Sequence, residues 1–278
     1  MSNASVLFDA PGPKAARRHR AIGVVTVLVL LGVVALVVWK LWSEDQFTAD
    51  KWEPFVTPNL VELLARGLLD TLRAAVLAIA GAVVFGVVFG IAKLSDHAFV
   101  RWPAWLVVEF FRAVPLLLLI VAIWLSQGTP LGVIYPLVIG LVLYNGSVLA
   151  EVFRAGINAV PKGQAEAAYA IGLTKTAVTR IILLPQAVKI MLPSIISQCI
   201  VALKDTSLGF AILAPSLTVA GREIWRTFDN RLATALVLAA VYIVLNVLLT
   251  WLGEWLQRRY VGEQRPVEIV GGQVVTHP

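Results

Sequence analysis

Long apolar runs without a charged residue constrain this chain more than any other feature. Four such runs cover residues 21–39, 74–92, 131–150 and 232–253. Each is close to the roughly 20 residues that an α-helix needs to cross the hydrocarbon layer of a bilayer. With 59% hydrophobic and 14% charged residues, the composition excludes an ordinary soluble enzyme and a disordered chain. We therefore expect an all-α, polytopic membrane protein.

Two further apolar segments carry charges inside them. Residues 102–126 hold only Glu109 and Arg112, and residues 190–220 hold only one adjacent Lys-Asp pair. Charged side chains within a span are costly, so they face the bundle interior, a partner or an aqueous path. Counting both segments gives about six transmembrane helices, the fifth ending shortly after Gly209.

The distribution of Lys and Arg predicts the orientation in the membrane. With the N-terminus inside, fourteen of the 23 Lys and Arg residues fall on the cytoplasmic side and seven on the outer side. Such an excess marks the cytoplasmic face. An even number of spans then places both termini in the cytoplasm. Because the basic residues flank spans and form no single stripe, nucleic acid is not an expected partner.

The first apolar run follows Arg17, Arg18 and Arg20, but it is too long for a signal peptide and no cleavage site follows it before Trp42. We interpret it as an uncleaved transmembrane helix. The expected organisation is a cytoplasmic tail at 1–20, the first transmembrane helix at 21–42, an extracytoplasmic loop at 43–70, a core domain at 71–258 with a cytoplasmic loop at 154–189, and a cytoplasmic tail at 259–278.

That cytoplasmic loop carries the clearest helix signals outside the spans. Residues 164–171 are rich in alanine and predict a short helix that Gly172 stops. Thr174 can cap a second helix running to Leu184, which Pro185 is expected to interrupt. Two short helices in a loop are suited to docking against another protein.

A motif within this loop gives the first family resemblance. Glu166-Ala167-Ala168, followed at fixed spacing by Gly172 and later by Ile182 and Leu-Pro, resembles the EAA loop of permease subunits of bacterial ABC importers. The resemblance implies a type I importer fold in which this loop holds a coupling helix that sits in a cleft of the ATP-binding subunit. We expect Ala167 and Ala168 to be exposed. The coupling residues it implies are Gly163, Glu166, Ala167, Ala168, Gly172, Leu184 and Pro185.

Other strings narrow the resemblance. Residues 111–116 are similar to the FRGTPLL segment of polar amino-acid permeases, with Ala-Val in place of Gly-Thr, and residues 203–208 match their LKDTSL segment. The strings at 6–14, 94–97 and 107–112 resemble glutamate uptake permeases. The resemblance therefore implies a permease for glutamate, with glutamine, arginine or histidine as alternative substrates of the same machinery.

The resemblance also implies the partners. These are ATP-binding cassette ATPase subunits, a second homologous permease in a heterodimer, an extracytoplasmic solute-binding protein, the amino acid and the lipid bilayer of a bacterial plasma membrane. The chain has no GxxxxGK[ST] string, so ATP and Mg would bind the partner ATPase. We expect a transport subunit and no enzyme, with no catalytic residue, cofactor or metal of its own. An ion-coupled secondary transporter is the alternative of another class; it would show inverted repeats, which we do not find.

Polar residues within the spans are candidates for the substrate path. Arg112 could attract a substrate carboxylate or pair with Glu109 on one helix face. Ser147 and Glu151 also share a face, which could line the path or contact the second permease. The candidates are Arg112, Asn145, Ser147, Glu151, Lys204, Asp205 and Ser207.

Small residues and prolines in the spans predict local packing. Gly86 and Gly90 form a GxxxG pattern that permits close helix contact. Pro115, Pro136 and Pro193 are expected to kink their helices.

Overall fold

The computed structural model describes residues 13–127, 132–261, 268–270 and 273–275. This part of the chain is helical apart from a short antiparallel hairpin of β1 (Glu268–Val270) and β2 (Gln273–Val275), with Glu268 opposite Val275. The all-α fold class is therefore confirmed. Much of the two expected tails lies outside the described residues, as does the N-terminal string at 6–14 except for its last two residues.

Five helices are long and apolar enough to cross a membrane, and a sixth span results if the bent pair α4 and α5 counts as one. This agrees with the six spans expected from the sequence. In chain order the spans are α1 (Pro13–Ser43), α3 (Pro58–Ala92), the pair α4 (Ala98–Ala113) and α5 (Leu116–Gln127), α6 (Ile134–Asn158), α9 (Leu184–Asp205) and α11 (Arg231–Val261).

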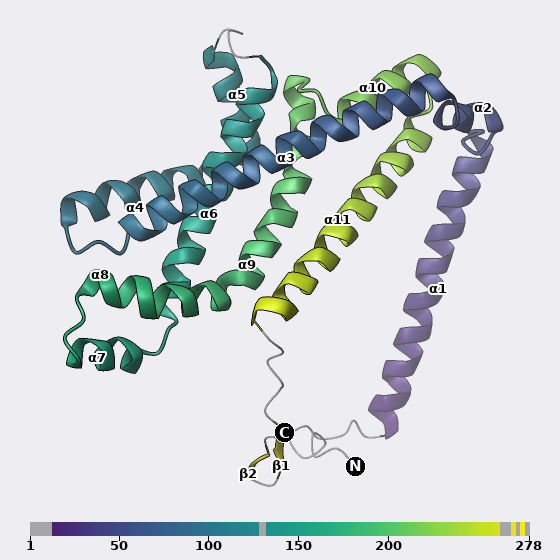
Figure 1. Cartoon of the computed structure of the whole chain (residues 1–278). Helices are drawn as coiled ribbons and strands as arrows, with labels where there is room; N and C mark the ends of the chain where they lie inside the picture. The colour runs from purple at the N-terminus through teal and green to yellow at the C-terminus, as the bar shows by residue number, and fades with distance from the viewer. Residues whose placement is uncertain (1–12, 128–131, 262–267, 271–272, 276–278) are drawn as a thin grey trace.

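Shorter helices connect the spans. They are α2 (Ala49–Trp52), α7 (Lys162–Ala170), α8 (Lys175–Ala177) and α10 (Leu217–Phe228), with 3-10 turns at Glu53–Phe55 and Thr206–Ile212 and a π-helical segment at Val178–Leu183. Figure 1 shows α7 and α8 toward the same end of the molecule as the start of α1 and the end of α11, whereas α5 and α10 lie toward the opposite end. The loop that resembles the EAA loop thus lies at the end expected to be cytoplasmic.

Helix α1 stands apart from the other spans in Figure 1, and none of its apolar window is buried in the chain. Its exposed valines and leucines are side chains that lipid tails solvate. The connection after α1 is held to the far end of the bundle by two hydrogen bonds. Lys51 Nζ donates to the Asp229 carbonyl, and the buried Asn230 Nδ2 donates to the Lys51 carbonyl, both at 2.9 Å.

The closest helix packing joins α3 to α6 through glycine. A Cβ atom added at Gly86 would lie 2.7 Å from Leu149 Cβ, and one added at Gly90 would lie 2.9 Å from the Ala150 carbonyl oxygen. Phe85 of α3 packs against Gly146 of α6, where an added Cβ atom would lie 2.8 Å from Phe85 Cδ1. The expected close contact at the GxxxG pattern is confirmed, and it makes α3 and α6 one tightly packed unit.

Replacing Gly90 by alanine should therefore loosen this unit. The added methyl group meets backbone, which cannot rotate away, so we expect a loss of about 1–3 kcal/mol in stability, the usual effect of overpacking. Thermal unfolding of the purified protein in detergent measures the change. Gly32→Ala is the matched control, because a Cβ there meets nothing within 4 Å. Equal melting of the two variants would contradict the packing argument.

The third expected span is bent by 102° between α4 and α5. Val114 is extended (φ −77°, ψ 127°) and precedes Pro115, which disfavours helix at the residue before it and has no N–H to donate. The expected break at Pro115 is confirmed. Arg112 lies in the last turn of α4, immediately before this bend. By contrast, α9 continues through Pro193.

Two apolar clusters hold the bundle together. One fills the space between α3, α5, α6 and the 3-10 turn after α9, and includes the fully buried Ile120 and Leu141. The other joins α3, α6 and the start of α9, and includes Phe153 and Met191. The second cluster fixes the end of α6 and the start of α9, the two helices between which the loop with α7 and α8 lies.

Candidate coupling loop and transport path

Helix α7 ends in a glycine stop. Gly172 has φ +84°, a left-handed conformation that glycine adopts without strain. The Gly172 N–H donates to the Tyr169 carbonyl at 2.9 Å, and the Leu173 N–H donates to the Ala168 carbonyl at 3.2 Å. These two bonds form a Schellman motif. The expected stop at Gly172 is confirmed, and it turns the chain sharply between α7 and α8.

The second helix of the loop begins as expected and continues further. The Ala177 N–H donates to Thr174 Oγ1 at 3.4 Å, which confirms the cap. The expected interruption at Pro185 is absent, because the π-helical segment leads directly into α9 and the Leu184 N–H donates back to the Thr179 carbonyl. Proline lacks an N–H, and the wider π turn before it absorbs the missing helical bond.

The outward face of α7 mixes one acid with apolar side chains. Glu166 and Ala167 are exposed, as are Tyr169 at 46% and Ile171 at 78%. Ala168 was expected to be exposed but is only 5% exposed. It lies on the side of α7 that packs against the π-helical segment, since neighbouring helix residues point in different directions. The exposed Tyr and Ile were not selected from the sequence, although apolar residues in a polar loop are a usable signal.

The remaining coupling candidates lie at different places in the loop. Gly163 is exposed in the first turn of α7. Leu184 and Pro185 line an apolar groove of about 520 Å³ between α9 and the end of α11, where Leu256 forms the opposite wall. The structure thus brings Gly163, Glu166 and Ala167 together on α7 and places the Leu-Pro pair apart from them.

One ion pair fastens this loop to the turn between α3 and α4. The Lys175 ammonium at the start of α8 contacts the Asp96 carboxylate, and both side chains are exposed. The hydrogen bond from Lys175 and its charge lower the pKa of Asp96 below its ordinary value. The pair links two segments that are far apart in the sequence.

This ion pair should be present at neutral pH and lost in acid. Because the pKa of Asp96 is lowered in the folded state, the contact contributes fully above the ordinary carboxyl pKa of about 3.9 and disappears as the pH falls through the lowered value. Spin labels at His97 and Thr176, in a chain with Cys199 replaced by serine, should give a narrow distance distribution at pH 7. Asp96→Asn should broaden it at pH 7; an unchanged distribution would contradict the prediction.

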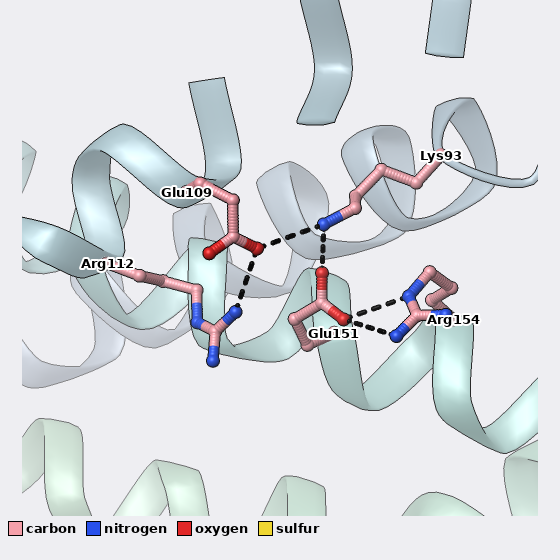
Figure 2. Close-up of polar contacts among 5 residues, drawn as sticks. All are labelled: Lys93, Glu109, Arg112, Glu151 and Arg154. Atoms are coloured by element: carbon pink, nitrogen blue, oxygen red, sulfur yellow. Dashed lines mark hydrogen bonds and ion pairs between the residues drawn. The ribbon is translucent and has the colours of Figure 1, made fainter. Parts of the chain in front are cut away.

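Five charged side chains form an alternating chain near the end of α3 (Figure 2). Lys93, which caps α3, contacts Glu151 of α6 and lies 3.4 Å from Glu109 of α4. Arg112 Nη1 is 3.1 Å from Glu109 Oε1, and Arg154 Nε donates to Glu151 Oε2 at 2.9 Å. Only 4% of the Lys93 side chain is exposed, and it is the one buried charged residue in the described part of the chain.

This ionic cluster contains two of the expected path residues, Arg112 and Glu151. Two roles were considered for Arg112, attraction of a substrate carboxylate and pairing with Glu109. In the structure Arg112 is paired with Glu109. Lys93 directly follows the apolar run at 74–92, and its burial could not be predicted. A charge that ends an apolar run looks the same in sequence whether it faces water or a neighbouring helix. Arg154 was missed for a similar reason.

A second polar group joins α6 to α9. Asn145 is 1% exposed, and Gln198 Nε2 donates to its Oδ1 at 2.5 Å. The half-buried Asp205 also approaches Asn145. Gln198 was not selected from the sequence. Buried side-chain hydrogen bonds of this kind hold membrane helices together and are also typical of substrate paths.

The other expected path residues are placed separately. Ser147 is buried and its Oγ donates to the Leu143 carbonyl of its own helix at 2.7 Å, so it is satisfied within α6. Lys204 is exposed at the end of α9, and Ser207 is half-buried in the following 3-10 turn. Within the described residues, no three His, Cys, Asp or Glu side chains are grouped to hold a metal ion.

The fold defines a class of protein: a multi-span membrane protein with a loop of short helices, α7 and α8, between the spans α6 and α9. Residues 82–262 match the family described as binding-protein-dependent transport system inner membrane component. The glutamate transport system permease protein GluD of Corynebacterium glutamicum is 38% identical over 227 residues, covering 79% of this chain and 83% of that protein. The chain belongs to this family of transport-system membrane subunits.

Further relatives and solved structures agree. The glutamate/aspartate import permease protein GltK of Escherichia coli O157:H7 is 29% identical, covering 73% of this chain and 96% of that protein. A crystal structure of an amino acid ABC transporter with histidines is similar at TM-score 0.68 and 29% identity, covering 72% of this chain and 94% of that one. The inward-facing MetNI methionine ABC transporter, at TM-score 0.65 and 21% identity, covering 73% of this chain and 99% of that one, shares the fold.

Proposed function

We propose that this chain is the permease subunit of an ATP-driven amino-acid importer in the bacterial inner membrane, with glutamate as its substrate. The observation that carries the proposal is the outward face of α7. Glu166, Ala167 and Tyr169 of this helix are exposed, as is Ile171, the residue that follows it before the Gly172 stop. Apolar side chains of this size on a water-facing loop favour a protein partner.

In the proposed machine, the α7 face docks in a cleft of an ATP-binding cassette ATPase. Closure of two ATPase subunits around ATP pulls the loops of two permeases together and rocks the spans from inward-open to outward-open. The second permease is a homologous chain in a heterodimer, and a solute-binding protein delivers the amino acid outside. ATP and Mg bind the ATPase. The N- and C-termini are cytoplasmic, in line with the charge distribution.

Glutamate is proposed because two of the relatives carry glutamate in their names, one of them at 38% identity. Other relatives are named for different amino acids. A putative glutamine permease of Rickettsia conorii and an arginine permease of Bacillus subtilis are both 28% identical to this chain. Glutamine, arginine or histidine are therefore the alternative substrates of the same machinery.

A competition experiment tests the substrate. The chain is reconstituted in liposomes with its ATPase, second permease and solute-binding protein, and uptake of labelled glutamate is measured against an excess of each unlabelled amino acid. We expect glutamate and aspartate to compete and glutamine, arginine and histidine to have little effect. ATP-dependent uptake of another amino acid, with glutamate inert, would retain the machine and overturn the substrate.

A further inference from the structure

We infer that Lys93 is a positioning residue: its ion pairs with Glu109 and Glu151 form a joint through which movement of the coupling loop reaches the broken helix α4–α5. The inference rests on the proposed function and adds a route by which the ATPase acts on the membrane part. It follows from the placement, packing and burial of the five charged residues in Figure 2.

The joint lies between the two parts that must move together. Glu151 and Arg154 belong to the last turns of α6, which leads directly into α7 of the coupling loop. Glu109 and Arg112 belong to the last turns of α4, immediately before the 102° bend. Lys93 joins these two sides, so displacement at the end of α6 acts on the helix segment next to the bend.

Packing near the joint differs on its two sides. Helices α3 and α6 interlock at Gly86 and Gly90, where no further approach is possible, and they are expected to move as one body. Helix α4 also packs on the bundle through its buried Ala104 and Val108, but an open cavity of about 510 Å³ lies beside this contact. Its lining includes Lys93, Glu109, Glu151, Arg154, Trp102 and Trp105. Flexible lysine and glutamate side chains spanning this cavity can keep contact while α4 shifts.

The charges themselves argue for a role beyond packing. A buried ammonium is costly unless it is paired, and here two carboxylates compensate it while an arginine holds each carboxylate from outside. Replacing a whole buried ion-pair network by neutral side chains is often tolerated, whereas removing one partner is not. Stability and coupling can therefore be separated by experiment.

The test uses the complete importer in liposomes and measures glutamate transported per ATP hydrolysed. The triple variant Lys93→Met, Glu109→Gln and Glu151→Gln removes the inner charges and leaves the side-chain volumes nearly unchanged. We expect it to be recovered with its partners, to hydrolyse ATP, and to transport at least fivefold less glutamate per ATP. The single variant Lys93→Arg keeps the positive charge and should transport at least half as much glutamate per ATP as the wild type.

If the triple variant transports as much glutamate per ATP as the wild type, the proposed joint is wrong and the ionic cluster has only a packing role. If the triple variant is not recovered, the single variants Arg112→Gln and Arg154→Gln test the joint instead. These arginine side chains are about 40% exposed, and their loss leaves the buried Lys93 paired with Glu109 and Glu151. Each should lower the ratio at least twofold, and unchanged ratios in both would overturn the proposal. A wild-type complex without any ATP-driven uptake is a different result, which contradicts the proposed function itself.

Discussion

Glu166→Lys is expected to reduce ATP-driven uptake at least a hundredfold while the chain still inserts in the membrane. Glu166 is exposed on the outward face of α7, and no ion pair within the described part of the chain holds it. Reversing a charge at the centre of a docked surface leaves a buried charge unpaired, which costs about 2–5 kcal/mol; a hundredfold loss corresponds to about 2.7 kcal/mol. Uptake and co-purification of the ATPase should fall together.

The control for this variant is Glu254→Lys. Glu254 is also exposed and lies near the end of α11, at the same end of the molecule but outside the loop. It should leave uptake within twofold of the wild type, and both variants should be found in the membrane at the wild-type level. Normal uptake by Glu166→Lys would contradict the assignment of α7 as the coupling helix.

Lys204→Gln is expected to lower glutamate uptake about tenfold, mainly through a raised KM. Lys204 is an exposed cation about 30 Å along α9 from its first residue, at the end of the span that the proposed orientation places outside. A cation there can meet an anionic substrate arriving from outside, and a charge-assisted hydrogen bond is worth about 1.5–3 kcal/mol. Uptake rates over a range of glutamate concentrations measure the effect.

Lys189→Gln provides the matched control on the same helix. Lys189 is also exposed, but it lies near the start of α9, at the opposite end of the helix from Lys204. Its variant should keep KM within twofold of the wild type, and Lys204→Arg should retain part of the affinity because the charge stays. If Lys204→Gln and Lys189→Gln change KM equally, Lys204 has no specific role in the substrate path.

The membrane spans could be predicted from the sequence because the length of each uncharged apolar run indicates whether it can cross the bilayer. Uncharged runs predict spans because the bilayer requires them, and the helix stop at Gly172 and the cap at Thr174 follow from local backbone chemistry. The direction of the chain after Pro115 could not be predicted, because a proline breaks a helix without fixing the angle of the bend. The continuity of α9 with the loop depends on a π turn, for which the sequence carries no simple signal.

The candidate site also has a part that the sequence predicts and a part that it does not. Glu166 and Ala167, which are both exposed, were selected from the sequence motif, whereas the exposed Tyr169 and Ile171 were not selected. Ala168 was expected to be exposed but is buried, because its direction depends on how α7 packs.

The ionic cluster was only partly predictable. Glu109 and Arg112 are three residues apart on one helix, so their pair follows from helical spacing. Lys93 and Glu151 are far apart in the sequence, and only the tertiary packing of α3 against α6 brings them together.

The central claim is that this chain transports an amino acid with energy supplied through its coupling loop by a separate ATPase. The most direct test measures glutamate uptake into liposomes that contain the complete importer, with ATP inside, without ATP, and with a hydrolysis-defective ATPase. Uptake is expected only with ATP inside and an active ATPase. Uptake that proceeds without ATP and follows an imposed ion gradient would contradict the central claim and favour a secondary transporter.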